Sequence, residues 1–323
     1  MPRPTSVAIL LSTVTLALSA CGGGPATVPA PTATTLEFSV PPTLRLGSTT
    51  PLTVVARDAS GAVVSGTAIL TSSDSRLLSV GADGAASALR LTPDTAPVTL
   101  TAKFGTLEKT AQISTYGLEL AGGTYNSNFG TPQAALGTAL TTRFRPPAGA
   151  APFSKVPVSL TGPTGFDAGL FPVTVSKPLT EGTAGTSNLA RSAQRPVAGS
   201  YTASVTVNGE LYTASATLDP TSVLTPPGTP AVALTSTGLT LNASPAPGTT
   251  VSATVYASGP ALALTRDRGA SELPYSYTFP APLAPGVYNR GVFGYSSPTF
   301  AFTSPTPPQL NVSFSYLGTT TVQ

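Results

Sequence analysis

The chain has 323 residues, of which 41% are hydrophobic and only 9% are charged, and its formal net charge is +3. This length and apolar content are enough for about two or three domains with ordinary cores. With no histidine and a single cysteine, the chain lacks the residues of Ser/His/Asp triads, Cys/His nucleophiles, ordinary zinc sites and disulfides. Its few Lys and Arg residues are not clustered, which argues against a nucleic-acid partner. We therefore expect no enzyme activity, no cofactor, no metal and no nucleic acid.

Residues 1–20 have the features of a bacterial export signal. Arg3 and the α-amino group supply a positive start, and residues 7–18 supply an apolar stretch. That stretch is shorter than the roughly 20 apolar residues that a membrane-spanning helix needs. An ordinary secretory signal has the same pattern, so the residues that follow decide its type.

The signal ends with Leu18, Ser19 and Ala20, directly before Cys21 and three glycines. This pattern resembles the lipobox of bacterial lipoproteins, in which the cysteine is lipidated and becomes the N-terminus after cleavage. The resemblance implies that Cys21 carries acyl chains such as palmitate and holds the protein on a bacterial membrane. It also implies a place in the cell envelope, facing the periplasm or the cell surface.

Residues 21–35 are expected to form a tether. After Cys21 the segment reads GGGPATVPAPTATT, which is rich in Gly, Pro and Thr and has no apolar periodicity. Such segments do not pack a core and behave as spacers. The folded part is therefore expected to begin at Leu36.

Residues 36–116 are predicted to form a first β-sandwich domain. Short runs rich in Val, Thr, Leu and Phe are separated by Gly, Pro and Asp, which is the pattern of strands joined by tight turns. Turns are predicted at residues 58–61 and at Asp83 and Gly84. Residues 98–104 and 107–113 are predicted to pair as a hairpin through Gly105.

The first domain also resembles the bacterial immunoglobulin-like domain of group 2, which is common in surface adhesins and envelope proteins. The resemblance rests on Leu46 with Gly47, residues 72–74 (SSD), the Asp83 and Gly84 turn, and residues 98–102. It departs from the family pattern at Leu70, where the family has a core Trp, and near Asp94, where it has a Gly. The resemblance implies an immunoglobulin-like sandwich over about 80 residues.

Residues 117–225 are predicted to form a second immunoglobulin-like sandwich, in which the clearest element is a hairpin. Residues 201–207 and 210–218 flank Asn208 and Gly209, and this dipeptide supplies the two positive φ angles of a type I′ turn. Tyr201 resembles the tyrosine corner of immunoglobulin sandwiches. Because Ala203 stands at the cysteine position, the Tyr201 hydroxyl rather than a disulfide would tie this corner.

Residues 226–323 are predicted to form a C-terminal sandwich after a stiff linker that contains Pro226, Pro227 and Pro230. Tyr288 follows Gly286 and Val287 in the same spacing as Tyr201 follows Gly199 and Ser200, so it is a second candidate corner. The predicted strands cover residues 231–234, 239–243, 250–256, 275–279, 291–295 and 310–317. The fold class is thus all-β, with tandem immunoglobulin-like sandwiches after a signal peptide and a tether.

Arg143 and Arg145 flank Phe144 on a predicted strand, so both guanidinium groups project to one side. Such a pair can hold phosphate or carboxylate groups of an envelope polymer. It can also be a solvated strand face that discourages pairing at a sheet edge. Both interpretations remain open from the sequence.

Tyr275, Tyr277 and Phe279 share one face of a predicted strand. Strand alternation makes such a stripe a part of the core by default. The alternative is an exposed aromatic platform that contacts a glycan or an envelope protein. Tyr275 and Tyr277 are therefore candidate ligand contacts.

The carboxylates lie mainly in predicted turns, where Asp side chains bond their own backbone. Two alternatives are a loop calcium site and a pair of carboxylates that hydrolyses glycosides. The residues concerned are Asp58, Asp74, Asp83, Asp94, Asp167 and Asp267.

These observations predict a non-enzymatic envelope lipoprotein that presents tandem domains for adhesion, scaffolding or ligand binding. This functional step rests on fold and location rather than on a catalytic or binding site. One alternative is an assembly subunit that docks in a larger envelope complex through a strand edge. The other is a secreted hydrolase that uses only carboxylates.

Overall fold

The computed structural model describes residues 32–93, 96–127, 135–150, 155–166, 173–176, 185–186, 190–192, 196–257, 263–264, 268–296 and 309–323. The signal, Cys21 and most of the tether lie outside this set. Strands make up the regular structure of the described residues, apart from one turn of 3-10 helix, Ala270–Glu272. No helix among these residues has the length and apolar character to cross a membrane. The prediction of an all-β chain is confirmed.

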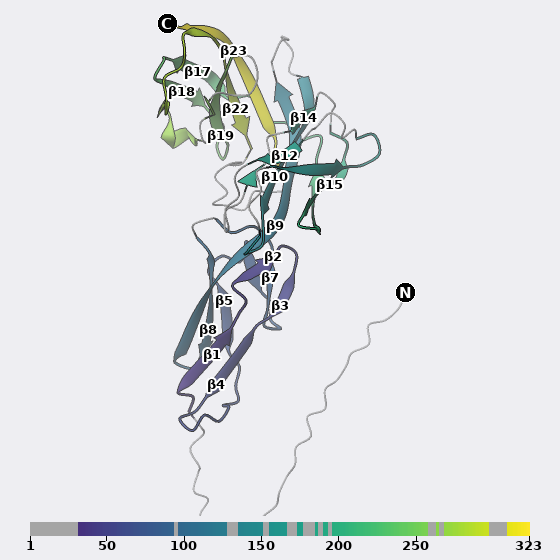
Figure 1. The fold of residues 1–323 in the computed structure, drawn as a ribbon, viewed down its shortest axis with the longest axis vertical. Helices are drawn as coiled ribbons and strands as arrows, with labels where there is room; N and C mark the ends of the chain where they lie inside the picture. The colour runs from purple at the N-terminus through teal and green to yellow at the C-terminus, as the bar shows by residue number, and fades with distance from the viewer. Residues whose placement is uncertain are drawn as a thin grey trace, which may run out of the picture.

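The first sandwich is formed by strands that begin directly after the tether (Figure 1). Its strands are β1 (Thr35–Ser39), β2 (Thr43–Arg45), β3 (Thr49–Pro51), β4 (Thr53–Arg57), β5 (Ile69–Ser72), β6 (Leu78–Val80), β7 (Ala85–Ala88), β8 (Val98–Phe104) and the first part of β9 (Leu107–Ser127). β5, β8, β9 and β2 lie in one sheet, while β3, β7 and β6 form another. Leu78, Leu100 and Ile113 meet in the core between them.

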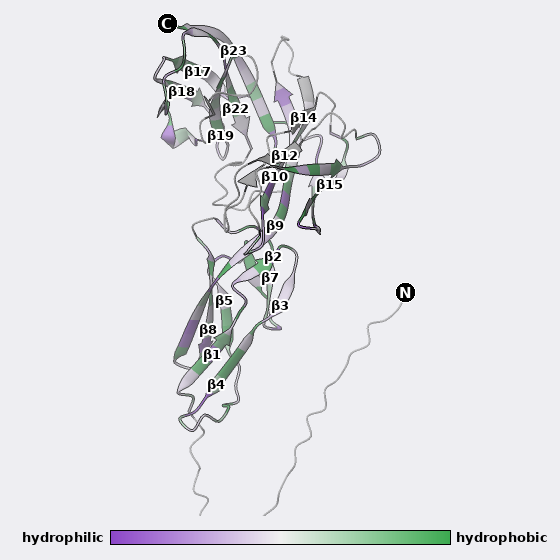
Figure 2. Ribbon diagram, viewed as in Figure 1, coloured by the Kyte–Doolittle hydropathy of each residue, from purple (hydrophilic) through white to green (hydrophobic). Residues whose placement is uncertain are grey.

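Period-two alternation explains why these residues form strands. Along β8, Val98, Leu100 and Ala102 are buried, while the residues between them are less buried. Hydrophobic and hydrophilic residues accordingly alternate along the strands of this sandwich (Figure 2). One face of the sheet therefore packs in the core and the other meets water.

The predicted turns of the first sandwich are present. The Asp58 carboxylate accepts hydrogen bonds from the backbone N–H groups of Ser60 and Ala62. Gly84 has a φ of 77°, a value that glycine adopts without a steric cost. The hairpin of β8 and β9 turns through Gly105, as the sequence predicts.

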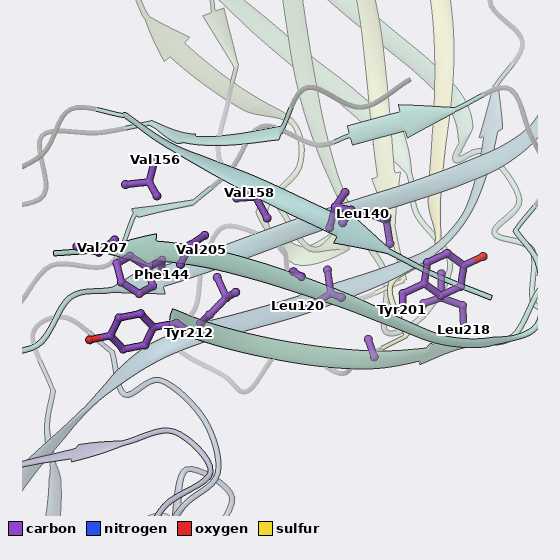
Figure 3. Packing of buried hydrophobic residues seen from close by; sticks show 14 residues of the cluster. Leu120, Leu140, Phe144, Val156, Val158, Tyr201, Val205, Val207, Tyr212 and Leu218 are labelled. Carbon is purple, nitrogen blue, oxygen red and sulfur yellow. The ribbon is translucent and has the colours of Figure 1, made fainter. Parts of the chain in front are cut away.

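The second sandwich packs a four-stranded sheet against β9 and its partner β10 (Figure 3). Its further strands are β10 (Ala135–Arg145), β11 (Lys155–Thr161), β12 (Val173–Ser176), β13 (Gly185–Thr186), β14 (Ala190–Ser192), β15 (Gly199–Val207) and β16 (Glu210–Leu218). Leu120, Phe144 and Tyr212 are buried in this core. The β15–β16 hairpin has φ angles of 52° at Asn208 and 79° at Gly209, so the predicted turn chemistry is confirmed.

In the third sandwich, a three-stranded sheet in the order β17-β18-β21 packs against β19, β22 and β23. Its strands are β17 (Gly228–Leu234), β18 (Gly238–Ser244), β19 (Thr250–Tyr256), β20 (Ala263–Leu264), β21 (Tyr275–Thr278), β22 (Gly286–Tyr295) and β23 (Val312–Val322). Leu241, Val255 and Val292 are fully buried between the two layers.

The second and third sandwiches share one continuous sheet, whose order is β13-β10-β9-β23-β22-β19-β20. The sequence predicts separate tandem domains, and this joining of their sheets is not visible in it. β9 also passes without a break through the predicted boundary between residues 116 and 117. β1 and β4 lie at one end of the molecule, and the C-terminus lies at the other (Figure 1).

The Pro-rich segment before β17 is not a free linker. The hydroxyl of Thr124 donates to the carbonyl of Ser222 at 2.7 Å, and the amide of Asn126 donates to the carbonyl of Leu224 at 3.1 Å. Prolines lack the N–H that a strand ladder needs, so side chains of β9 bind this segment instead. It therefore lies along β9.

Candidate functional site: two junctions around strand β9

β9 contacts all three sandwiches. Its 21 residues pair with β8, β2, β10 and β23. We call the contacts between the first and second sandwiches the first junction, and those between β9 and the start of β23 the second junction.

One side of the first junction is built around Arg45, the last residue of β2. Its guanidinium donates to the Glu210 carboxylate at 2.6 Å and to the carbonyl of Leu211 at 2.6 Å. It also lies 4.7 Å from the centre of the Tyr212 ring, within range of a cation–π interaction. An exposed ion pair alone contributes about 0–1 kcal/mol. The bond to a carbonyl and the contact with the ring add to it and fix the orientation.

The Tyr212 hydroxyl reinforces this side of the junction. It donates to the second oxygen of Glu210 at 2.6 Å. Burial raises the pKa of Tyr212, and the hydrogen bond to the Glu210 carboxylate raises it further. The phenol therefore remains a protonated donor over the ordinary range of pH.

The other side of the first junction is built around Arg145, near the end of β10. Its guanidinium donates to the hydroxyl and the carbonyl of Thr92, each at 2.7 Å, and to the carbonyl of Thr115 at 2.8 Å. Arg143 also points toward the Thr92 carbonyl, at 3.4 Å. Thr92 belongs to the loop of the first sandwich that follows β7, so both arginines bind the neighbouring sandwich.

Neither sequence interpretation of Arg143 and Arg145 fits this geometry. The two residues are 4% and 3% exposed, so they are not a solvated face. β10 has β9 on one side and β13 and β14 on the other, so it is not a sheet edge. Their burial against the loop of the first sandwich also removes them as an open binding surface for a polymer.

Glu119 of β9 lies beside these arginines. Its carboxylate accepts the backbone N–H of Leu91 at 2.8 Å. Loss of hydration raises the pKa of Glu119, while the Leu91 bond and the nearby Arg143, Arg90 and Arg145 act in the opposite direction. The charged form of this carboxyl is therefore disfavoured in the folded state.

A small pocket opens at this point of the first junction. It is lined by Arg90, Glu119, Leu120, Ala121, Thr141, Thr142 and Arg143. The pocket has room for about one water molecule. It is therefore too small for a sugar, a nucleotide or a drug-sized ligand.

The second junction is built around Asn311, directly before β23. Its side-chain oxygen accepts hydrogen bonds from the backbone N–H of Thr124 at 3.1 Å and from the Gln309 amide at 2.8 Å. Its amide nitrogen donates to the Ser222 hydroxyl at 2.8 Å. One buried side chain thus joins β9, the Pro-rich segment and the last strand.

Gly123 makes this close approach possible. A Cβ atom at residue 123 would overlap the side-chain oxygen of Asn311 and the backbone of Leu310. The backbone N–H of Leu310 also donates to the Gly122 carbonyl at 2.7 Å. The sequence supplies glycine where the two backbones meet.

Tyr275 and Tyr277 do not form an exposed platform. Tyr277 packs against the third core together with Phe279, which is 8% exposed. Both Tyr275 and Tyr277 are half-buried. The rings of Tyr277 and Phe279 pack edge to face with their centres 5.9 Å apart. Arg268 covers the Tyr275 ring at 3.8 Å from its centre. The stripe is part of the core and its rim.

Both tyrosine corners have their hydroxyl bonds. Tyr201 donates to the Val197 carbonyl at 2.9 Å and accepts from the Val197 N–H at 2.9 Å. Tyr288 donates to the Ala284 carbonyl at 2.6 Å. Each tyrosine thus binds the backbone four residues upstream.

Three of the six candidate carboxylates lie in described residues, and each binds the backbone of its own turn. Asp58, Asp74 and Asp83 each accept a backbone N–H within four residues. Asp94, Asp167 and Asp267 lie outside the described residues, as does the lipidation candidate Cys21. Within the described ranges, no group of three or more His, Cys, Asp or Glu residues is placed to hold a metal ion.

No protein-family model matches the chain, and no curated protein matches it either. Among solved structures, it is similar to domains 5–6 of the S-layer protein SbsC, with 15% identity, 59% of this chain and 100% of that chain covered, and a TM-score of 0.23. It is also similar to domains A168–A170 of titin, with 13% identity, 89% and 99% covered, and a TM-score of 0.20. At these values the likenesses carry no argument about function.

Proposed function

We propose that this protein is a non-enzymatic lipoprotein of the bacterial cell envelope, in which a rigid series of β-sandwiches holds the distal domain away from the membrane. The observation that supports it best is the first junction, where Arg45 and Arg145 bind the neighbouring sandwich from two sides of one continuous strand. A joint bound in this way resists bending. The role that suits a rigid extension is adhesion or scaffolding.

The lipobox resemblance at Cys21 supplies the anchor in this proposal. Each buried methylene of an acyl chain contributes about 0.8 kcal/mol, and two or more chains hold a protein stably on a membrane. The tether would place the first sandwich at most about 40 Å from the bilayer if it is extended. The first sandwich is then a spacer, and the third sandwich is the favoured contact with an envelope protein or glycan.

Fatty-acid labelling of growing cells tests the anchor. The wild-type chain is expected to take up a labelled fatty acid and to fractionate with membranes. Cys21→Ala should remove the label and leave an unprocessed precursor or a soluble protein. Ser19→Ala, which keeps a small residue two positions before Cys21, is the matched control and should be labelled normally. A label that persists in Cys21→Ala contradicts the proposed anchor.

Crosslinking in intact cells tests the distal contact. A photoreactive residue at the exposed Val287 of the third sandwich is expected to capture an envelope component. The same residue at the exposed Ile69 of the first sandwich is the control, and it should capture less. Equal capture at both positions, or none at either, contradicts a contact made by the third sandwich.

A further inference from the structure

Three strands of the molecule run parallel to one another and contact in series. β2, near the start of the fold, pairs parallel with β9 through residues 43–45 and 114–116. β9 then pairs parallel with β23, the last strand, through residues 125–127 and 312–314. The chain enters the first sandwich through β1, which leads directly into β2. β9 then passes from the first sandwich to the second, and β23 is the last strand.

Tension along the chain acts on these strands in a particular direction. It pulls β2 toward the N-terminus and β9 toward the C-terminus. Because the two strands lie side by side and run parallel, they would have to slide past each other lengthwise. Hydrogen bonds of a sheet lie across the strands, so sliding strains all the bonds of a pair together instead of opening them one by one. The same reasoning applies to β9 and β23.

Further contacts lie at each of these two pairings. Beside β2, the N–H of Ser114 donates to the Pro42 carbonyl at 3.1 Å, and the N–H of Leu46 donates to the Tyr116 carbonyl at 2.8 Å. Arg45 then extends the contact to the second sandwich. Beside β23, Asn311 binds Thr124 and the N–H of Leu310 binds Gly122. The two junctions therefore coincide with the two places where tension passes between strands.

We propose that this protein bears tension between its membrane anchor and a partner at its far end, and that the load passes through β2, β9 and β23. The chain between Ser127 and Val312, which holds most of the second and third sandwiches, lies off this path. The biological role of the load path rests on the proposed anchor at Cys21. The path itself is a property of the fold and can be measured without a membrane.

Single-molecule force spectroscopy on the unlipidated mature chain tests the load path. Cys21, the single cysteine of the sequence, serves as one attachment point and a C-terminal tag serves as the other. Each sandwich is identified by the length it releases, about 3.5 Å per residue. Arg45→Met should lower the unfolding force of the first sandwich. Thr124→Val removes a hydroxyl at the second junction. It should lower the unfolding force of the sheet that the second and third sandwiches share.

Two buried residues off the path provide the matched controls. Leu78→Ala in β6 and Leu241→Ala in β18 should lower the melting temperature of the chain and change the unfolding force less than the junction variants do. If the force instead follows the lost thermal stability, regardless of where the substitution lies, the load path is wrong. A failure of fatty-acid labelling at Cys21 in cells would remove the anchor but leave this measurement unaffected.

Discussion

Arg145 reaches out of its own sandwich to bind Thr92 twice, once at the hydroxyl and once at the carbonyl, both at 2.7 Å. The two residues lie 53 positions apart in the chain and are both buried. This contact fixes how the first sandwich meets the second. It also makes the junction dependent on a guanidinium that binds neutral acceptors.

Arg145→Met should destabilise the chain by about 2–4 kcal/mol, because the buried acceptors on Thr92 and Thr115 would lose their donor. Urea unfolding followed by circular dichroism measures the change. Arg57→Met is the control, since Arg57 forms an exposed ion pair with Glu37 and should cost no more than about 1 kcal/mol. Equal losses in both variants would contradict the importance of the first junction.

Gly123→Ala should cost about 1–3 kcal/mol, because an added Cβ would overlap Asn311 and Leu310 and force the strands apart. Thermal unfolding provides the measurement. Gly286→Ala is the matched control, because a Cβ there meets only ordinary contacts with Tyr288. If the two glycine variants melt alike, the close approach at the second junction is not specific.

Tyr201→Phe should cost about 1–3 kcal/mol, because it leaves the N–H and carbonyl of Val197 without the hydroxyl that binds both. Tyr288→Phe should cost less, since Tyr288 serves a single carbonyl. Tyr277→Phe, at a partly buried ring of the same type, is the comparison variant and should be close to neutral. Chemical unfolding measures the loss of stability in each variant. A loss for Tyr277→Phe as large as that for Tyr201→Phe would contradict the corner assignment.

Glu119 should make stability depend on pH. Its pKa is raised in the folded state, so the folded state holds its proton more tightly than the unfolded state does. The stabilisation from this proton is fully present below the ordinary pKa of glutamate and is lost as the pH rises through the raised value. Glu119→Gln should remove this part of the pH dependence, which urea unfolding at a series of pH values can detect. An unchanged profile would contradict the raised pKa.

Local patterns in the sequence were sufficient for the fold class and for several of its details. The Asn208 and Gly209 turn, the alternation along β8 and the spacing around Tyr201 involve residues close in the chain, so their chemistry can be read directly. The faces of β10 and β21 were also predicted correctly, with Arg143 beside Arg145 and Tyr275 beside Tyr277.

What covers each face could not be predicted in the same way. The partner of Arg45 is Glu210, which lies 165 residues further on, and no local pattern relates the two. For the second junction, one signal was available. Asn311 is a polar residue beside Leu310 and Val312 at the start of an apolar strand, and a polar residue in such a place needs a buried partner. Its partners Thr124 and Ser222 could come only from the structure.

A strand that belongs to two cores has a consequence for folding. Ile113 belongs to the first core, and Leu118 and Leu120 belong to the second, within one uninterrupted β9. A chain cut at residue 116 would leave each half with only a part of this strand. Each of the two sandwiches should therefore be less stable without the other, and fragments divided at that position are expected to aggregate through the exposed strand ends.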